Sequence, residues 1–434
     1  MTPTRQDCFA LDARDPLAAL RAEFTLPDGV IYLDGNSLGA LPKATPARLQ
    51  QVVSEEWGRG LIRSWNTAGW TLLAERIGNK IGALVGAGPN ELAVGDSTSV
   101  NLYKVLKTAL LLNGAGARRR IVSERSNFPT DLYIAESVAR EHGGELVLAD
   151  AADDLGMLLD ERAACLLLTH VNYRSGRMHD LAALTRSAHA AGAVAVWDLA
   201  HSAGAVPVDL TGADADFAVG CGYKYLNGGP GAPAFLWAHP RHTARMDREE
   251  LRQPLSGWFG HAAPFEFAPS YQPAGGIQRF ACGTPSVLSM AALECGVDVF
   301  FKAQAHGGLA AVRDKSLALG RLFIDLVESR CAGLGLTLVT PREPALRGSQ
   351  VSYAHAHGHA VMQALIARGV IGDFRAGDTA ATAALEASAD LLRFGFTPLY
   401  TRHIDVWDGV DQLHDVLASG EWRESRFSHR AAVT

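Results

Sequence analysis

Short apolar runs that end in polar residues recur between residues 90 and 225. These runs end near Val94, after 120–124, at Thr169 and His170, before Asp198 and before Gly222. Stretches with helical periodicity separate them, at 100–112, 129–143 and 181–191. Runs of this length that end in polar residues are typical of buried strands. Because strands and helices alternate, we predict an α/β fold with a mostly parallel, doubly wound sheet.

The remaining pattern predicts further elements before residue 90 and after residue 225. A short helical arm is expected at 16–24, a strand at 30–34, and helices over 46–85 interrupted by SWNTAGW at 64–70. After a strand at 234–238 and a helix at 289–301, strands and helices alternate again from 310 to the last helix. We therefore predict three parts: an N-terminal arm and active-site loop (1–45), a large domain (46–300) and a smaller C-terminal α/β domain (301–434).

Composition excludes several classes of protein. The 434 residues are 48% hydrophobic and 20% charged, with a net charge of −6, which fits a globular enzyme and disfavours nucleic acid as a partner. No apolar run approaches the roughly 20 residues of a membrane span, and the N-terminus lacks a signal-peptide pattern. Six scattered cysteines include no C-x-x-C pair. We expect a cytoplasmic protein with no membrane partner.

Two polar residues follow neighbouring strands of the predicted sheet. Asp198 ends one strand, and Lys224 follows the next, beside Tyr223 and before a glycine-rich loop. Carboxyl ends of parallel strands meet at a crevice, where ligands bind. One lysine and one carboxylate at such a place suit a pyridoxal phosphate enzyme. The alternatives are a helix-capping aspartate and a solvated loop lysine.

A run of small polar residues marks a second feature of this crevice. Asp96, Ser97, Thr98 and Ser99 precede the helix expected near Val100. Hydroxyls and free backbone N–H groups at a helix N-terminus suit a phosphate group, although an ordinary N-cap would also need one of them. The chain lacks the lysine of a P-loop and has no G-x-G-x-x-G, which disfavours a nicotinamide cofactor.

Aromatic residues occur beside both features. In NFPTD, Phe128 is placed to lie over a ring, and Asp131 is placed to cap the following helix. Trp57, Trp65 and Trp70 form either part of the core or a stacking wall for a flat substrate.

Three further motifs were considered as functional sites. Ser37 is the centre of a G-x-S-x-G match, but Pro42 and Pro46 interrupt the helix that a nucleophile elbow requires, so a loop presenting Ser37 to a ligand is favoured. Alternating histidines at 355, 357 and 359 lack an accompanying carboxylate, and we expect no metal site. The alanine-rich segment 377–390 is expected to be a surface insertion or a short helix.

Taken together, these segments resemble the kynureninase family, pyridoxal phosphate hydrolases of the aspartate aminotransferase superfamily (fold type I). The resemblance covers nearly the whole chain. It rests on YLDGNSLG, EEWGRGLIRSWNTAGW, SNFPTDLY, THVNYRSGRMHD, WDLAHSAGAVPVDL, YKYLNGGPG, GWFGH and LRFGFTPLY. The alanine-rich insertion before Arg393 departs from the family pattern and weakens the assignment of that residue.

The resemblance implies a role for each site residue. Lys224 would form the Schiff base with pyridoxal 5′-phosphate, Asp198 would pair with the pyridine nitrogen, and His201 would lie beside the cofactor. The other cofactor contacts implied are Thr98, Ser99, Phe128, Pro129, Thr130, Asp131, Thr169 and Tyr223, with Trp258 and Thr284 reaching in from the neighbouring subunit of a homodimer. Tyr223 would also transfer a proton. Ser37 and Trp65 would line the substrate pocket, and Arg393 would grip the substrate α-carboxylate.

The implied reaction is hydrolysis of the Cβ–Cγ bond of L-kynurenine to anthranilate and L-alanine, in tryptophan catabolism and the route to NAD. Whether 3-hydroxykynurenine is also a substrate stays open. A cysteine desulfurase or an aminotransferase of the same fold is the nearest alternative, and Cys282 is the one cysteine in a suitable loop. A non-catalytic ligand-binding protein is a third reading, which the presence of both Asp198 and Lys224 disfavours.

Overall fold

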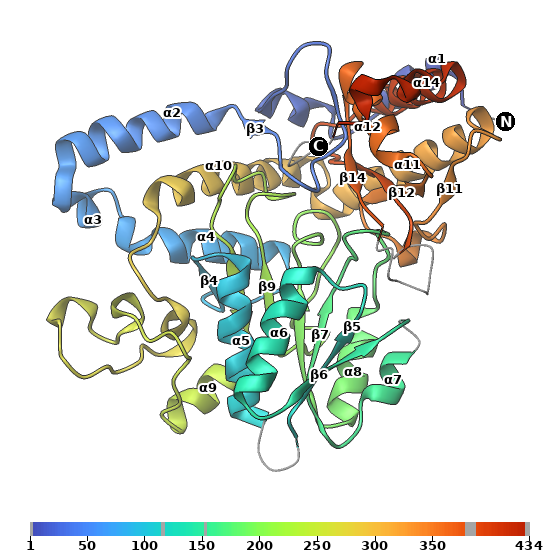
Figure 1. Ribbon diagram of the computed structural model, residues 1–434. Coiled ribbons are helices and arrows are strands. Elements are labelled where there is room, and N and C mark those ends of the chain that lie inside the picture. The colour runs from blue at the N-terminus through green and yellow to red at the C-terminus, as the bar shows by residue number, and fades with distance from the viewer. Residues whose placement is uncertain (1–2, 114–117, 152–153, 378–387, 430–434) are drawn as a thin grey trace.

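The computed structural model describes residues 3–113, 118–151, 154–377 and 388–429 (Figure 1). A seven-stranded sheet forms its centre, with helices on both faces. In order across the sheet the strands are β4 (Leu92–Val94), β10 (Phe235–Ala238), β9 (Phe217–Gly220), β8 (Val194–Asp198), β7 (Ala163–Thr169), β5 (Arg120–Glu124) and β6 (Glu145–Ala149).

The sheet is mostly parallel, as predicted. Strands β6, β5, β7, β8 and β9 pair in parallel, whereas β10 is antiparallel to both β9 and β4. A parallel neighbour needs a crossover connection, usually through a helix. The segment 221–234 between β9 and β10 contains no helix, so the chain turns back beside β9.

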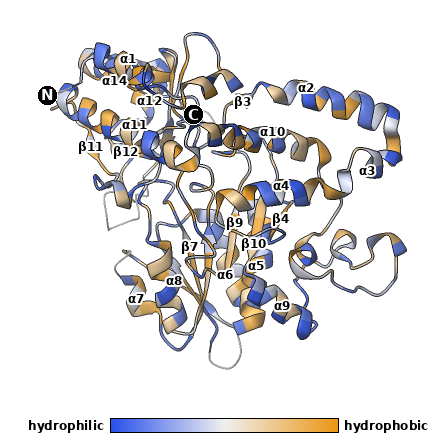
Figure 2. Cartoon of the chain, turned by 180° about the vertical axis from the view of Figure 1, so that it is seen from behind, coloured by the Kyte–Doolittle hydropathy of each residue, from blue (hydrophilic) through white to orange (hydrophobic). Residues whose placement is uncertain are grey.

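Alternate residues of the central strands belong to two separate hydrophobic cores. Leu166 and Leu168 of β7 pack in one core, and Cys165 and Leu167 pack in the other. Successive side chains of a strand point to opposite faces, so both faces of the sheet are buried. Figure 2 shows the resulting hydrophobic character of the central strands around β7 and β10.

Helices cover the two faces of the sheet and complete both cores. One core contains residues of α5 (Thr98–Asn113) and α6 (Pro129–Glu141). The other contains residues of α4 (Trp70–Leu84), α8 (Leu181–Ala190) and α10 (Val287–Ala303). The remaining helices of this part are α2 (Ala44–Gln51), α3 (Ser64–Thr67), α7 (Leu155–Leu158) and α9 (Pro240–Arg248).

The expected break at 64–70 is confirmed in part. Helix α3 occupies its first four residues, and Gly69, with a φ of 70°, separates α3 from α4. The sequence pattern did not predict that α2 continues into a π-helical segment, Val52–Gly60. Together α2, this segment and α3 form an arm that projects from the body (Figure 1).

The strands and helices expected after residue 310 are present, and the strands form a smaller antiparallel sheet. Its strands, in order, are β11 (Thr337–Leu338), β12 (Gln350–Ala354), β15 (Leu391–Gly395) and β14 (Asp373–Arg375). Helices α11 (Gly308–Arg330), α12 (Gly358–Ala367) and α14 (His403–Ser419) pack with it around a third core.

The N-terminal segment packs against this C-terminal part. The helix expected at 16–24 is a 3-10 helix, Ala18–Glu23, and an additional helix, α1 (Arg5–Asp12), precedes it. A capping box between Thr4 and Asp7 starts α1, and Arg5 pairs with Asp408 of α14 at 2.8 Å. The strand expected at 30–34 is β2 (Ile31–Tyr32), which pairs with β13 (Val370–Ile371). Strands β1 (Phe24–Thr25) and β3 (Leu41–Pro42) form a small separate pair.

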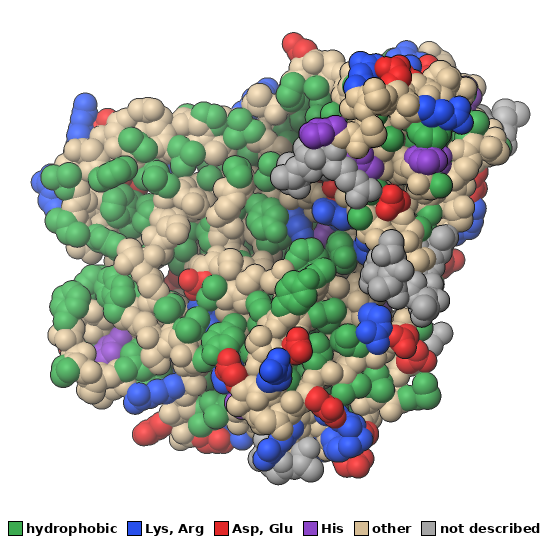
Figure 3. Space-filling view, viewed as in Figure 1, with side chains coloured by type: hydrophobic (Ala, Val, Ile, Leu, Met, Phe, Trp, Pro, Cys, Tyr) green, Lys and Arg blue, Asp and Glu red, His purple; other side chains and the backbone are tan. Residues whose placement is uncertain are grey.

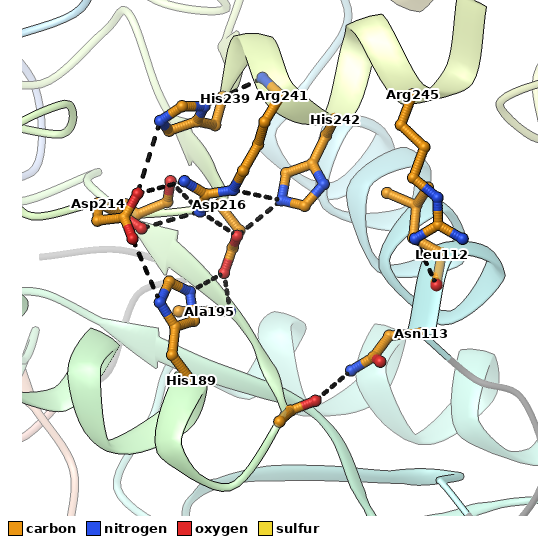
Figure 4. Close-up of polar contacts among 12 residues, drawn as sticks. Leu112, Asn113, His189, Ala195, Asp214, Asp216, His239, Arg241, His242 and Arg245 are labelled. Carbon is orange, nitrogen blue, oxygen red and sulfur yellow. Dashed lines mark hydrogen bonds and ion pairs between the residues drawn. The ribbon is translucent and has the colours of Figure 1, made fainter. Parts of the chain in front are cut away.

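A buried carboxylate joins several elements at the edge of the sheet where the parallel strands begin (Figure 4). Asp216 accepts a hydrogen bond from Ala195 N at 2.7 Å and lies 2.7 Å from His189 Nε2 and 2.6 Å from His242 Nε2. Arg241 also pairs with it. These contacts connect β8 with α8 and α9, and they neutralise a charge that would otherwise be costly to bury.

No helix in the described part of the chain combines the length and apolar character that a membrane span requires.

Candidate active site

A cavity of about 130 Å³ lies where β7, β8 and β9 end. Most of the predicted cofactor residues line it, together with two that the sequence did not single out, Tyr173 and Ala200. The lining residues are Ser97, Thr98, Ser99, Phe128, Thr130, Asp131, Thr169, Tyr173, Asp198, Ala200, His201, Tyr223 and Lys224. Pro129 is the first residue of α6 and lies directly beside this wall.

Strand register brings Thr169 and Asp198 together. The two residues are paired neighbours on parallel strands, so their side chains lie on the same face of the sheet. That face is the one covered by α5 and α6, and Asp131 sits in the first turn of α6. Thr169 Oγ1 lies 3.5 Å from Asp131 Oδ2 and also bonds to Asn127 Oδ1.

Asp131 and Asp198 form a buried carboxyl pair. Burial raises the pKa of both side chains, and the charge of Asp198 raises the pKa of Asp131 further. The charge of Lys224 lowers the pKa of Asp198, and so does the hydrogen bond that the Ala200 backbone N–H donates to Asp198 at 2.7 Å. These effects place the proton of the pair on Asp131 in preference to Asp198.

The Lys224 amine lies 2.9 Å from His201 Nε2. Burial, and then the charge of Lys224, lower the pKa of His201 well below its usual value, so the imidazole is neutral. Its other nitrogen, Nδ1, lies 3.1 Å from Oε1 of Gln350 on β12. The sequence analysis missed Gln350, because nothing in its local pattern distinguishes it from other strand residues.

The polar run at 96–99 leads directly into α5. Ser97 caps the helix, since its Oγ accepts from Val100 N at 3.3 Å, whereas Thr98 and Ser99 are the first helical residues and line the cavity. Asp96 is paired with the buried Lys104 at 2.6 Å. The N-terminal end of this 16-residue helix therefore faces the cavity with free hydroxyls, as an anion site would.

Aromatic rings form another part of the wall. The Phe128 ring meets the Tyr173 ring edge-on, with centroids 5.1 Å apart. Lys224 Nζ lies 5.8 Å from the centroids of both the Phe128 and the Tyr223 rings. Burial raises the pKa of Tyr223, so its hydroxyl stays protonated at neutral pH.

A second cavity of about 370 Å³ shares Ser97, Thr98 and Tyr223 with the first. Thr284 and Phe259 line this second cavity. Trp258 lines neither of the two and packs instead on Phe259, with centroids 5.2 Å apart.

The predicted group of tryptophans is only partly present. Trp65 contacts Trp70 and Phe259, with centroids 6.0 Å and 5.9 Å away. Trp57 is 58% exposed on the π-helical segment and shares none of these ring contacts, so its expected place in the aromatic group was wrong.

Arg393 and Ser37 meet at the boundary with the C-terminal sheet. Arg393 is 1% exposed, and its guanidinium donates to Ser37 Oγ and to the Tyr173 carbonyl, both at 2.7 Å. It also pairs with Asp373, which Arg375 contacts at 2.8 Å. No helix directly follows Ser37 as a nucleophile elbow would require. Its hydroxyl accepts a hydrogen bond from Arg393 and is also hydrogen-bonded to the Asp34 carboxyl group.

The other candidate motifs lie outside these cavities. His357 stacks on Trp422 with centroids 4.6 Å apart, and β12 ends before the alternating histidines. Among the described residues no group of three or more His, Cys, Asp or Glu is placed to hold a metal ion. Most of the alanine-rich segment, 378–387, lies outside the described residues.

The surroundings of Cys282 do not favour a reactive cysteine of the kind that a desulfurase needs. Cys282 is partly exposed and lines the larger cavity, but Arg279, the nearest basic residue in sequence, pairs with Asp247 and the Leu251 carbonyl. All six cysteines are free, and four of them are buried.

Comparisons with known proteins agree with this geometry. Residues 312–413 match the family model described as the kynureninase C-terminal domain. The chain is 55% identical to the kynureninase of Burkholderia mallei (strain SAVP1) over 435 residues, which cover 99% of this chain and 100% of the relative.

Solved structures share the fold at lower identity. A cysteine desulfurase from Thermococcus onnurineus NA1 superposes with a TM-score of 0.76 at 20% identity, covering 92% of this chain and 98% of that one. A C-DES mutant with glycine covalently linked to its PLP cofactor superposes with a TM-score of 0.73 at 16% identity, covering 95% and 100%. The chain therefore shares the fold of these two proteins.

Proposed function

This chain belongs to the kynureninase family, and we propose that it hydrolyses the Cβ–Cγ bond of L-kynurenine to anthranilate and L-alanine with Lys224 as the cofactor lysine. As a member of that family it is a pyridoxal phosphate-dependent hydrolase of carbon–carbon bonds in tryptophan catabolism. The observation that carries the proposal for the site is one cavity lined by Lys224, by the Asp131–Asp198 carboxyl pair and by the N-terminus of α5.

The residues around this cavity fit pyridoxal phosphate in kind and position. Thr98 and Ser99 at the start of α5 suit the phosphate group. The Phe128 ring borders the cavity and suits stacking on a flat heterocycle. Asp198, the carboxyl of the buried pair that gives up its proton more readily, suits a protonated ring nitrogen. When bound, the cofactor supplies an electron sink for the carbanion chemistry of an amino acid.

Each of the chain's own groups then has a task. Lys224 would remove the proton from the substrate Cα, and the neutral His201 Nε2 lies 2.9 Å away as a hydrogen-bond acceptor for its amine. Tyr223 borders both cavities and keeps its proton, so we assign it the donation of a proton to Cβ after cleavage. Arg393 would hold the α-carboxylate with its planar fork.

The larger cavity offers room for the aryl ketone. Phe259 lines it, and Trp65 packs behind Phe259. Both rings come from segments whose aromatic content suits a flat substrate better than a small thiol. We therefore place the substrate ring in this cavity, beyond Ser97 and Tyr223.

A homodimer is part of the proposal. Hydrophobic side chains gather on the arm and on the lobe beneath it (Figure 3). The exposed hydrophobic residues of these segments include Leu61, Ile62 and Phe267, and the last two are each 77% exposed. An apolar surface of this kind is typical of a protein–protein interface. In such a dimer Trp258 and Thr284 would complete the neighbouring subunit's site, and six free thiols suit the reducing cytoplasm.

The test compares reactions on the purified protein loaded with pyridoxal phosphate. Anthranilate fluorescence on L-kynurenine, with no sulfide released from cysteine and no amino-group transfer to a keto acid, is the expected result. The values of kcat/KM for L-kynurenine and 3-hydroxykynurenine then define the substrate preference. Sulfide release without anthranilate would refute the proposed reaction, and a protein that stays colourless with added cofactor would indicate a non-catalytic binding protein.

A further inference from the structure

Gln350 is buried between the smaller sheet and the site. Its Nε2 donates to the Tyr173 carbonyl at 3.0 Å and to the Asn172 carbonyl at 3.3 Å, and its Oε1 lies 3.1 Å from His201 Nδ1. The residue is 1% exposed and lies opposite Gly395 in the pairing of β12 with β15. The side chain therefore bridges two backbone carbonyls and the imidazole.

These contacts determine which way the amide points. A carbonyl oxygen can only accept, so the NH₂ group of Gln350 must face Asn172 and Tyr173. Its oxygen must then face His201, and a carbonyl oxygen requires a donor there. The proton of the neutral imidazole is consequently on Nδ1, and the lone pair on Nε2 faces Lys224 at 2.9 Å.

The charges around His201 favour a neutral imidazole. Lys224, Arg393 and Arg375 are the charged groups that act on the imidazole, and all three oppose a positive charge on it. The Asn36 amide is a further neighbour, 3.4 Å from Gln350 Oε1, and is uncharged. A doubly protonated His201 is thus disfavoured, and the position of its single proton depends on the group at Nδ1.

We propose that Gln350 is a positioning residue that keeps the His201 proton on Nδ1 and so presents an unprotonated Nε2 to the Lys224 amine. The role assigned to Lys224 rests on the proposed function, whereas the tautomer of His201 does not. The Tyr173 carbonyl that orients Gln350 also accepts from Arg393 at 2.7 Å, so one carbonyl helps to position both the histidine and the arginine.

The direct test is nitrogen NMR of ¹⁵N-histidine-labelled protein without cofactor, with the His201 signal assigned by its loss in His201→Asn. We expect the Nδ1–H form in the wild type and in Gln350→Glu, which keeps an oxygen acceptor at that position. In Gln350→Met, which has similar length and no strong acceptor, the Nε2–H form should appear. A wild-type Nε2–H form, or an unchanged tautomer in Gln350→Met, would overturn the proposal.

Kinetics of the loaded enzyme give a second readout. Hydrogen-bond partners that orient the histidines of metal sites typically change activity by roughly 10–100-fold when they are removed, and we take this range as the scale for Gln350. We expect kcat of Gln350→Met to fall by about that factor with a displaced pH profile, and Gln350→Glu to recover part of it. Gln304→Met, the same change at an exposed residue, is the control. A rise in KM alone would mean that Gln350 acts only by supporting the Arg393 pocket, and would contradict the proposal.

The two readouts separate the inference from the proposed function. If the wild type forms no anthranilate, the reaction assigned to the site is wrong, but the tautomer experiment still decides the role of Gln350. If Gln350→Met unfolds, the comparison of Gln350→Glu with the wild type remains: loss of the Nδ1–H form in a folded Gln350→Glu would count against the proposal, and its retention would support it.

Discussion

Arg393 donates a hydrogen bond to Ser37 Oγ at 2.7 Å across 356 residues of the chain. The contact depends on the backbone beside it, because Gly395 N donates to the Leu33 carbonyl at 2.7 Å and Asp34 forms a β-bridge with Gly395. The N-terminal loop is thereby held along β15. Two residues that were assigned to the substrate from separate motifs are thus in direct contact with each other.

Replacing Arg393 with lysine tests whether this residue binds the substrate α-carboxylate. Lysine keeps the charge but loses the planar fork, and a hydrogen bond to a charged group is worth about 1.5–3 kcal/mol. We expect KM for L-kynurenine to rise roughly 10- to 150-fold with a smaller change in kcat. Steady-state kinetics give both values. Arg368→Lys, on a surface ion pair with Glu421, is the control and should leave KM unchanged.

Replacing Lys224 with alanine tests the cofactor lysine. Without its amine, the protein should lack the visible absorbance band of a lysine-bound cofactor and should retain almost no activity. Absorbance spectra after addition of pyridoxal phosphate measure this directly. Lys302→Ala removes a half-exposed lysine and should behave as the wild type. A normal band in Lys224→Ala would assign the bound cofactor to another residue.

Replacing Tyr223 with phenylalanine tests the proton donor. A positioned proton donor contributes roughly 10²–10⁴-fold, so kcat should fall by about that factor while the cofactor still binds. Stopped-flow and steady-state rates, with a cofactor titration, separate the two effects. Tyr133→Phe, at an exposed position of α6, is the matched control. Unchanged turnover in Tyr223→Phe would remove this residue from the mechanism.

The Asp216 cluster predicts how stability depends on pH. Burial alone would raise the pKa of Asp216, but hydrogen bonds from His242, Arg241, Ala195 and His189 outweigh burial and lower it. Its charge therefore stabilises the fold above the unfolded pKa of about 4, and this stabilisation is lost as the pH falls through the lower folded pKa.

Replacing Asp216 with asparagine measures that contribution. Removing one partner of a buried ionic group typically costs about 3–5 kcal/mol, so the free energy of unfolding in urea should fall by about this amount at pH 7. The difference from the wild type should begin to narrow below about pH 4, where Asp216 of the unfolded wild-type chain takes up a proton, and it should vanish as the pH falls through the lower folded pKa. Asp150→Asn, on an exposed pair with Arg125, should have little effect at either pH. An equal difference at pH 7 and pH 3 would contradict the assigned titration.

The local elements and the ends of the strands could be predicted from the amino-acid pattern alone. Hydrophobic periodicity is a local property, and it located the strands that end at Thr169 and Asp198 and the helices on either side of them. Parallel strands place their carboxyl ends at one edge, so the meeting of Asp198 and Lys224 could also be predicted. The motifs around Thr98 and Phe128 were correctly placed at this crevice for the same reason.

Only the tertiary structure decided how these groups act on one another. The reversed direction of β10, the exposure of Trp57 and the contact of Arg393 with Ser37 depend on packing between distant segments. Gln350 reaches His201 across 149 residues, and the proton shared by Asp131 and Asp198 depends on their joint burial. Orientation and desolvation of polar groups arise from the assembled fold, and no local pattern in the chain encodes them.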